Sequence, residues 1–305
     1  MLGEMRSNEN LPHSLESSFT GDSITIETNK QQLSNNHAVG PKGGPMVPKF
    51  TGFPGPINRD TPTLRPVRRA VMRQDWSFLL FLHWEVPAES LRPLLPPGLE
   101  LDLYQGRAYV GLVPFTMSGV RPVGIPPFPW LSRYHETNVR TYVHVDGRDP
   151  GVWFFSLDAA NPLAVIAARA WFHLPYHHAR MRLTHESPGA GTTPGAISYS
   201  SERLWPGPKP ATHTIRCMPK GPITPAESGT LEHFLVERYL LYAAHRGRLH
   251  RGQVHHTPYP LQQADVTALD ESLLAAAGIV RPDVPPLAHF SRGVRVEVFP
   301  LTILP

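Results

Sequence analysis

The sequence predicts a mainly β protein with a few appended helices (α+β), arranged as an antiparallel barrel or sandwich. Three observations indicate this class. Short apolar runs rich in aromatic and β-branched residues recur from residue 76 onwards. Turn-forming pairs, among them Gln105-Gly106 and Asp146-Gly147, separate neighbouring runs. Helical spacing of apolar residues is confined to a few segments, and we find no internal repeat.

Residues 1–65 are predicted to form a disordered tail. They are rich in Asn, Ser, Gly, Pro and Thr, so they cannot bury enough apolar surface to offset the entropy of ordering. A start codon assigned too early is the alternative, because Met72 stands directly before the first strong element. With 41% hydrophobic residues the chain can build one large core or two smaller ones, and we expect a single domain over 66–305.

The first half of this domain is expected to contain strands and one short helix. A dense apolar run over 76–85 predicts a buried strand, and residues 87–95 predict a helix that starts at a proline and stops at Pro-Pro-Gly. The runs 99–103 and 107–115 flank a Gln-Gly pair and predict a hairpin. Residues 120–131 are rich in proline and predict a loop.

The second half is expected to add further strands and the best helix. Residues 136–145 and 151–157 predict a second hairpin, and residues 159–170 predict a short helix that runs into a strand. Residues 231–246 predict a helix, which Gly247 can cap. Further strands are expected over 180–183, 196–203 and 294–301.

Composition narrows the classes of function. The net charge of +4 is modest and only five of the 29 basic residues are lysines, so no basic helix indicates nucleic-acid binding. Cys217 is the single cysteine and cannot form an internal disulfide, which fits a reducing compartment. The apolar runs are too short to span a bilayer, and no signal-peptide core follows the N-terminus. We therefore expect a cytoplasmic protein that engages neither nucleic acid nor a membrane.

Three polar residues within an apolar run predict a ligand pocket. Glu136, Asn138 and Arg140 are spaced two apart, so a strand places all three on one face. A pocket carboxylate beside a cation and an amide would suit recognition of a polar small molecule. The alternative is that Glu136 and Arg140 form a cross-strand ion pair on a solvated face.

A second cluster follows the next apolar run. Arg169 ends that run, and its guanidinium is a natural partner for a substrate carboxylate, although an internal salt bridge with Glu136 is the alternative. Tyr176 and His177 come shortly after it, and His83 lies within the first predicted strand. The histidines do not match a known zinc spacing, so we expect no metal site. No Gly-x-Ser-x-Gly, Walker or Gly-x-Gly-x-x-Gly motif is present, and we expect no cofactor.

The chain resembles the YqjF-like family of bacterial proteins, the domain of unknown function 2071. The resemblance covers roughly residues 76–301, and its most specific segments are FLHWEVPAESLRPLLPPGLELDLYQGRAYVGLVPFTM (81–117) and FLVERYLLYAAHRGRLHRGQVHHTPYPLQQADV (234–266). It implies membership of the acetoacetate-decarboxylase-like superfamily and a curved antiparallel barrel around an internal pocket.

The enzymatic branch of that superfamily forms a Schiff base through the first lysine of a Phe/Tyr-Pro-Lys-Lys segment. The corresponding residues are Leu174-Pro175-Tyr176-His177, so Tyr176 stands in the lysine's place, and no lysine occurs between Lys49 and Lys209. Imine chemistry needs an amine, so the resemblance implies the pocket without the superfamily's best-known mechanism. Arg169 and Glu136 resemble an arginine and a glutamate of that branch.

These observations predict a pocket protein that binds a small carboxylate. We expect Glu136, Tyr176 and His177 to serve as catalytic groups, in a lyase or isomerase that needs no Schiff base. The ligand-binding residues would be Arg169, Arg140, Asn138 and His83. The alternative is a non-catalytic binding or structural protein that lost the catalytic lysine. Assembly into a homo-oligomer is left open.

Overall fold

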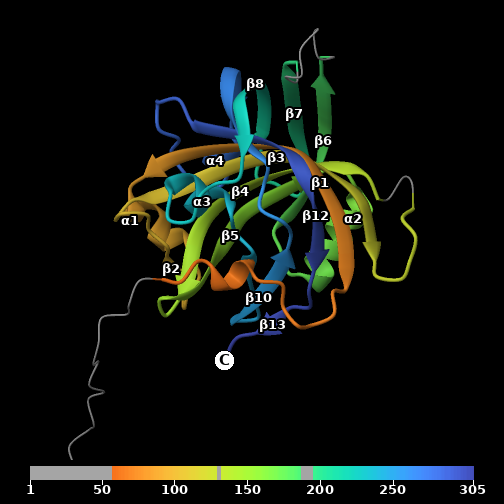
Figure 1. Ribbon diagram of the computed structural model, residues 1–305, viewed down its shortest axis with the longest axis vertical. Helices are drawn as coiled ribbons and strands as arrows, with labels where there is room; N and C mark the ends of the chain where they lie inside the picture. The colour runs from red at the N-terminus through yellow and green to blue at the C-terminus, as the bar shows by residue number, and fades with distance from the viewer. Residues whose placement is uncertain (1–56, 129–131, 187–194) are drawn as a thin grey trace, which may run out of the picture. The chain divides into compact units, whose positions relative to one another are not determined.

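The computed structural model describes residues 57–128, 132–186 and 195–305, and within this part of the chain one strongly curved sheet of thirteen strands dominates. The prediction of a mainly β fold with few helices is confirmed (Figure 1). The strands are β1 (Met72–Val86), β2 (Glu100–Leu101), β3 (Ala108–Pro122), β4 (Tyr134–Val145), β5 (Arg148–Ala159), β6 (Tyr176–His185), β7 (Ile197–Trp205), β8 (Thr212–Thr224), β9 (Leu240–His245), β10 (Arg248–His255), β11 (Leu261–Glu271), β12 (Leu287–Val298) and β13 (Thr302–Ile303). The helices are α1 (Ala88–Leu91), α2 (Pro162–Trp171), α3 (Leu231–Val236) and α4 (Leu273–Ala276), with short 3-10 turns at Thr61–Thr63 and Arg92–Leu94.

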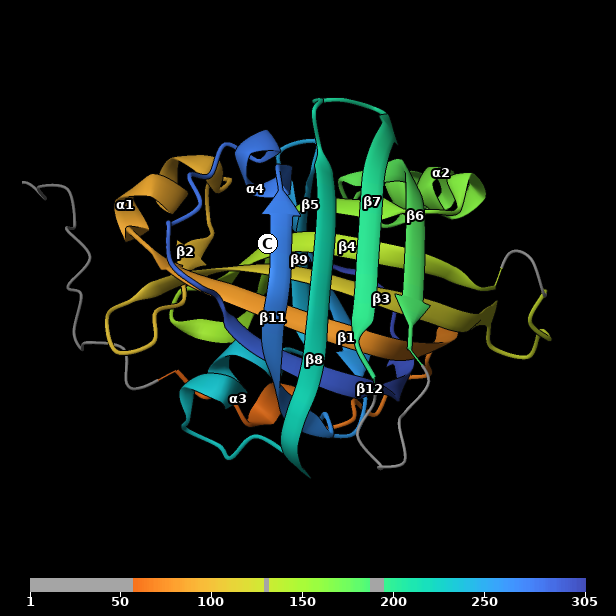
Figure 2. The ribbon, with the colours of Figure 1, turned by 90° about the horizontal axis from the view of Figure 1, so that it is seen from above.

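Seven of the strands pair in a closed circuit. In hydrogen-bonded order they are β4, β5, β9, β10, β12, β1 and β3, and β3 returns to β4. Most pairs are antiparallel, but β5 lies parallel to β9 and to β6. The strands β6, β7, β8 and β11 connect β5 to β12 by a second route, and Figure 2 shows them lying across β1, β3 and β4. The sheet therefore has an inner space and a second layer over one face.

The alternation of side chains along β1 supplies two cores. Leu80, Leu82 and Trp84 pack on the side of β7 and β8, together with buried residues such as Ile215. Leu79 belongs to a second cluster on the opposite face of the strand. Successive residues of a strand point to opposite faces, and each fully buried aliphatic or aromatic side chain contributes about 1.5–3 kcal/mol. The central strands are therefore buried on both sides, which explains their long apolar runs.

The two predicted hairpins have different outcomes. The second one is confirmed, because β4 pairs with β5 across Asp146 and Gly147, which both have positive φ as a tight turn requires. The first is wrong as a strand pair: β2 pairs with β4, and only an isolated bridge joins Tyr104 to Arg107. Both edges of β3 are occupied by β1 and β4, so β2 cannot pair with it.

The predicted helix over 231–246 is wrong beyond its first six residues. The helix α3 ends at Val236, and Leu240–His245 form strand β9 instead. One edge of β9 pairs with β10 and the other with β5, so a helix here would leave two strand edges without partners. Gly247 is not a helix cap: Arg246 and Gly247 have φ values of 51° and 73° and form the β9–β10 turn.

Two further boundaries differ from the prediction. The run 159–170 forms helix α2 with Asn161 at its N-cap, so Arg169 lies in the last helical turn and not at the end of a strand. Strand β3 continues to Pro122, three residues into the predicted loop.

The packed chain begins before the predicted boundary at residue 65. Arg59 forms an ion pair with the buried Asp102, and Arg65 pairs with Glu297 at 2.6 Å. Pro62 is itself buried. Residues 57–65 therefore contribute to the domain, while the predicted tail over 1–56 lies outside the described residues. Among the helices that the structure describes, none is long and apolar enough to cross a membrane.

Candidate functional site

A cavity of about 380 Å³ lies inside the seven-strand circuit, since all seven strands contribute to its lining. Most of the lining side chains are aliphatic or aromatic. Helix α2 covers one side and begins where the Asn161 side chain accepts hydrogen bonds from the backbone N–H groups of Leu163 and Ala164. Three small residues of this helix, Ala164, Ala167 and Ala168, face the cavity and leave room in it. This is the volume and character of a small-molecule site.

Strand β4 supplies four of the polar side chains that line the cavity. Tyr134, Glu136, Asn138 and Arg140 all line it, so the predicted shared face is confirmed. Their partners on β3 define successive levels: Glu136 lies opposite Phe115, Asn138 opposite Val113 and Arg140 opposite Gly111. The polar side chains therefore follow one another along the strand. The β3 residues opposite Glu136 and Asn138 are apolar.

Glu136 and Tyr176 form a hydrogen-bonded pair in the cavity. The Tyr176 hydroxyl donates to Glu136 Oε2 at 2.8 Å. Burial raises the pKa of Glu136 to about 8; the Tyr176 hydrogen bond partly opposes this effect, and the nearby Asp158 adds to it. Burial also raises the pKa of Tyr176 well above its usual value. At neutral pH the pair therefore holds its protons, and Glu136 can donate one to a bound molecule.

Arg140 is a buried cation without an anionic partner. Arg140 is only 8% exposed. Its Cζ atom lies 5.6 Å from the centre of the Phe81 ring and 5.8 Å from the centre of the Tyr142 ring. Its Nη2 donates to the Leu235 carbonyl oxygen at 3.0 Å, and its Nε has no partner. In the part of the chain that the structure describes, no carboxylate forms an ion pair with it. The Asn138 Oδ1 is also buried without a partner.

A second guanidinium, that of Arg238, lines the same cavity and was missed by the sequence reasoning. Its Nη1 donates to Asp102 Oδ2 at 2.7 Å and its Nε to the Phe234 carbonyl oxygen at 2.7 Å, while Nη2 has no partner. It lies 4.8 Å from the Tyr142 ring, which Arg140 also approaches. The sequence signal is the Glu-Arg-Tyr segment at 237–239, which falls within the helix predicted over 231–246.

His83 lies behind Arg140 and does not line the cavity. A Cβ atom on Gly111 would stand 3.0 Å from the His83 ring and 3.4 Å from Arg140 Cγ, so the glycine makes room for both side chains. Burial lowers the pKa of His83 well below its usual value, and Arg140 lowers it further, so the imidazole is neutral. The structure thus places His83 beside Arg140 and outside the lining of the cavity.

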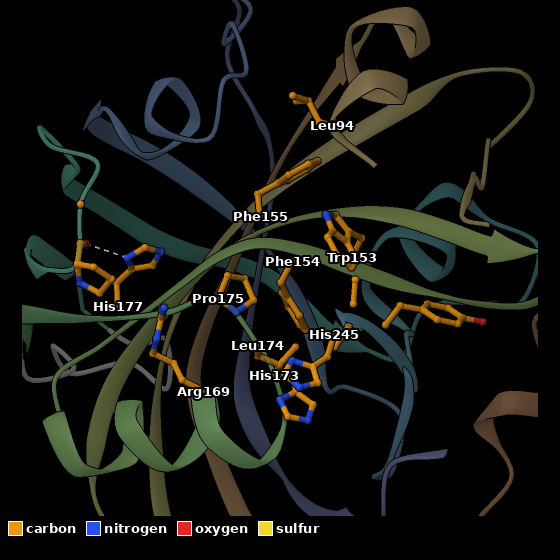
Figure 3. A pocket seen from close by; sticks show the side chains of 15 residues that line it. Leu94, Trp153, Phe154, Phe155, Arg169, His173, Leu174, Pro175, His177 and His245 are labelled. Atoms are coloured by element: carbon orange, nitrogen blue, oxygen red, sulfur yellow. Dashed lines mark hydrogen bonds between the residues drawn. The ribbon is translucent and has the colours of Figure 1, made fainter. Parts of the chain in front are cut away.

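Arg169 and His177 line a different, more open hollow of about 590 Å³ (Figure 3). Arg169 Nη1 donates to the backbone oxygen of Tyr176 at 2.7 Å, and His177 Nδ1 lies 2.9 Å from the Pro206 oxygen. Tyr176 and His177 are adjacent on β6, so their side chains point to opposite faces. Burial lowers the pKa of His177 to about 4. The expectation that Arg169 and Glu136 face one cavity is therefore wrong.

The described part of the chain offers few residues that could bind a metal ion or form an imine. The rings of His173 and His245 stack 3.7 Å apart at the edge of the open hollow, but no group of three or more His, Cys, Asp or Glu is arranged to hold a metal ion among these residues. Lys209 and Lys220 are exposed, and Lys220 pairs with Asp265. Neither lysine lines the cavity.

Comparison with known proteins assigns the family. Residues 73–295 match the model of the domain of unknown function 2071, described as an uncharacterized conserved protein. The chain belongs to this family. One relative is the uncharacterized protein YqjF of Bacillus subtilis (strain 168), which is 39% identical over 231 residues, or 76% of this chain and 91% of the relative. The predicted family resemblance is confirmed.

Solved structures support the fold of this family member. The enduracididine biosynthesis enzyme MppR complexed with pyruvate has a TM-score of 0.54 at 12% identity, covering 78% of this chain and 92% of MppR. An acetoacetate decarboxylase-like enzyme from Sphingomonas wittichii RW1 has a TM-score of 0.53 at 13% identity, covering 78% and 94%. At such identities the likeness shows the fold alone, which is acetoacetate-decarboxylase-like.

Proposed function

We propose that this protein binds a small-molecule carboxylate in the cavity, with Arg140 as its counter-ion. The observation that carries the proposal is the buried guanidinium of Arg140, which has no carboxylate partner among the described residues. Burying a charge without a partner is costly, so buried charges are normally paired. A ligand carboxylate would supply the missing anion, and the guanidinium fork suits a carboxylate geometrically.

Other polar groups of the cavity support the same proposal. Arg238 Nη2 and Asn138 Oδ1 are also buried without partners and can contact a ligand. MppR, one of the fold neighbours, is complexed with pyruvate, which is an oxo carboxylate. A purely structural role for the polar residues is disfavoured, because the space between them is open and not packed with side chains.

Proton transfer within the same cavity is the second candidate function. Glu136, with a pKa of about 8, is near the value at which a general acid or base works best at neutral pH, and Tyr176 is hydrogen-bonded to it. These two groups would move a proton to or from a bound oxo or hydroxy carboxylate, as a lyase or isomerase without a Schiff base does. His177, which lies on the other face of β6, has no part in this step.

Ligand-induced thermal stabilisation tests the binding function. Arg140→Gln is expected to abolish the stabilisation that carboxylates give to the wild-type protein. The matched control is Arg182→Gln, an exposed arginine on β6, which should respond as the wild type does. If no carboxylate stabilises the wild type, or if Arg140→Gln responds normally, the proposed function is wrong.

Exchange of substrate hydrogens tests the catalytic function. Oxo acids incubated with the protein in deuterated water should gain deuterium next to the carbonyl faster than with Glu136→Gln, as followed by NMR. Binding without such exchange, in a protein that passes the thermal test, would leave the non-catalytic binding function standing alone.

A further inference from the structure

We infer that the ligand of this cavity is an elongated monocarboxylate with a mostly apolar chain. The carboxylate would lie at the level of Arg140 and the chain would run along β4 toward Tyr134. The inference rests on the proposed function, and it names the class of molecule that the same site accepts.

The length of the cavity carries the first step. Its lining includes Tyr134 at one end of β4 and Arg140 six residues further on, which corresponds to about 20 Å of strand. The lining of β1 is also long and extends from Met72 to Phe81. Glu136 lies four residues from Arg140, about 13 Å along the strand. These are backbone separations, so a three- or four-carbon oxo acid held by Arg140 would leave much of the cavity empty. A carbonyl on which Glu136 acts would lie further along a longer chain.

The distribution of charge sets the orientation of the ligand. Among the described lining residues the two cations are Arg140 and Arg238, and both lie against the ring of Tyr142, so they share one end of the cavity. The part of the cavity from Asn138 to Tyr134 holds mostly apolar side chains, a few uncharged polar groups such as Gln74 and Tyr176, and the carboxyl group of Glu136. A second carboxylate in that part would meet no cation and would be repelled once Glu136 ionises. The cavity therefore favours one carboxylate and one apolar tail.

The opposite end of the cavity is apolar and reaches the surface. Phe128, Leu163 and Trp171 all line it and are nevertheless 58%, 59% and 73% exposed. Large apolar side chains that line a cavity and remain exposed indicate where an apolar ligand enters. The tail of the chain would lie between these residues, while the carboxylate reaches the buried arginines.

Titration with straight-chain carboxylates from acetate to decanoate tests the inference, read by the fluorescence of Trp76 and Trp171, which line the cavity. Affinity should rise roughly fourfold per added methylene until the cavity is filled. Decanedioate should bind at least tenfold more weakly than decanoate. If acetate and butanoate bind as tightly as octanoate, or the diacid binds as well as the monoacid, the inference is overturned while the proposed function stands. If no acid binds, the proposed function fails.

A pair of matched variants on α2 tests the placement of the chain. The helix starts three residues after Ala159, the strand partner of Glu136. It therefore covers the part of the cavity near Glu136, where the apolar chain would lie. Ala167→Leu narrows the cavity there and should weaken octanoate binding at least tenfold while leaving butanoate binding unchanged. Ala170→Leu is the control, because Ala170 is exposed and does not line the cavity. Equal losses for both acids in Ala167→Leu, or no loss at all, would contradict the inference; thermal melting confirms that both variants fold.

Discussion

Burial shifts the pKa of individual ionisable residues in the cavity away from the values that they have in water. Burial raises the pKa of Glu136 from 4.5 to about 8, whereas the unfolded chain keeps the usual value. The folded state therefore binds a proton more tightly than the unfolded state. Its stabilising contribution is fully present below the unfolded pKa and is lost as the pH rises toward 8.

The free energy of unfolding should accordingly fall between pH 5 and pH 9 by a few kcal/mol more in the wild type than in Glu136→Gln. Urea unfolding at several pH values measures this difference, and the shared contributions of the buried histidines cancel in the comparison. Identical pH profiles for the two proteins would mean that Glu136 ionises normally in the fold.

The two cavity arginines should differ in their effect on stability. Arg140 has no anion to leave behind, and the Tyr142 hydroxyl still donates to the Leu235 oxygen at 2.7 Å when the guanidinium is removed. Arg140→Met should therefore unfold at an equal or higher denaturant concentration than the wild type. Arg238→Met would leave the buried Asp102 with Arg59 as its remaining partner and should cost about 3 kcal/mol or more. A large loss in Arg140→Met would show that this arginine stabilises the fold and does not await a ligand.

At the scale of elements, the segment before β1 connects to the cavity. Residues 57–65 contain Arg59, whose partner Asp102 also holds Arg238. Arg59 lies 5.1 Å from the Phe234 ring as well. The segment therefore supports the buried ion pair that positions a cavity-lining arginine, although its composition predicted no contribution to the fold.

A truncated chain that starts at Val71 should consequently melt several degrees below the full chain. A chain that starts at Gly52 keeps these contacts and serves as the control. Arg59→Gln in the full chain should reproduce part of the loss. Equal melting temperatures for all of these chains would restore the original prediction that residues up to 65 are dispensable.

At the scale of the whole molecule, the fold is similar to those of acetoacetate decarboxylase-like enzymes, and no described lysine lines the cavity. Tyr176, which the sequence resemblance predicts to stand in place of the enzymatic branch's lysine, donates a hydrogen bond to Glu136. The described lysines, Lys209 and Lys220, are exposed and lie outside the cavity. A cavity without a described lysine therefore predicts a function that needs no Schiff base.

Incubation with pyruvate and borohydride should leave Lys209 and Lys220 unmodified, because an imine needs an amine held beside the carbonyl. Intact mass spectrometry followed by peptide mapping measures this. A stoichiometric adduct on either lysine, absent from the corresponding Lys→Arg variant, would show that Schiff-base chemistry survives outside the cavity.

The sequence by itself determined the strand class, the β4–β5 hairpin and the shared face of Glu136, Asn138 and Arg140, because a strand's two-residue period depends only on local order. The tertiary structure alone decided which other side chains join them. Arg238 lies against the same Tyr142 ring as Arg140 because residues 240–245 form a strand that pairs with two others, and not the helix that their spacing predicted. Arg169 is excluded because its run folds as a helix that covers the cavity from outside. Such long-range pairing satisfies backbone hydrogen bonds between distant segments, and no local pattern encodes it.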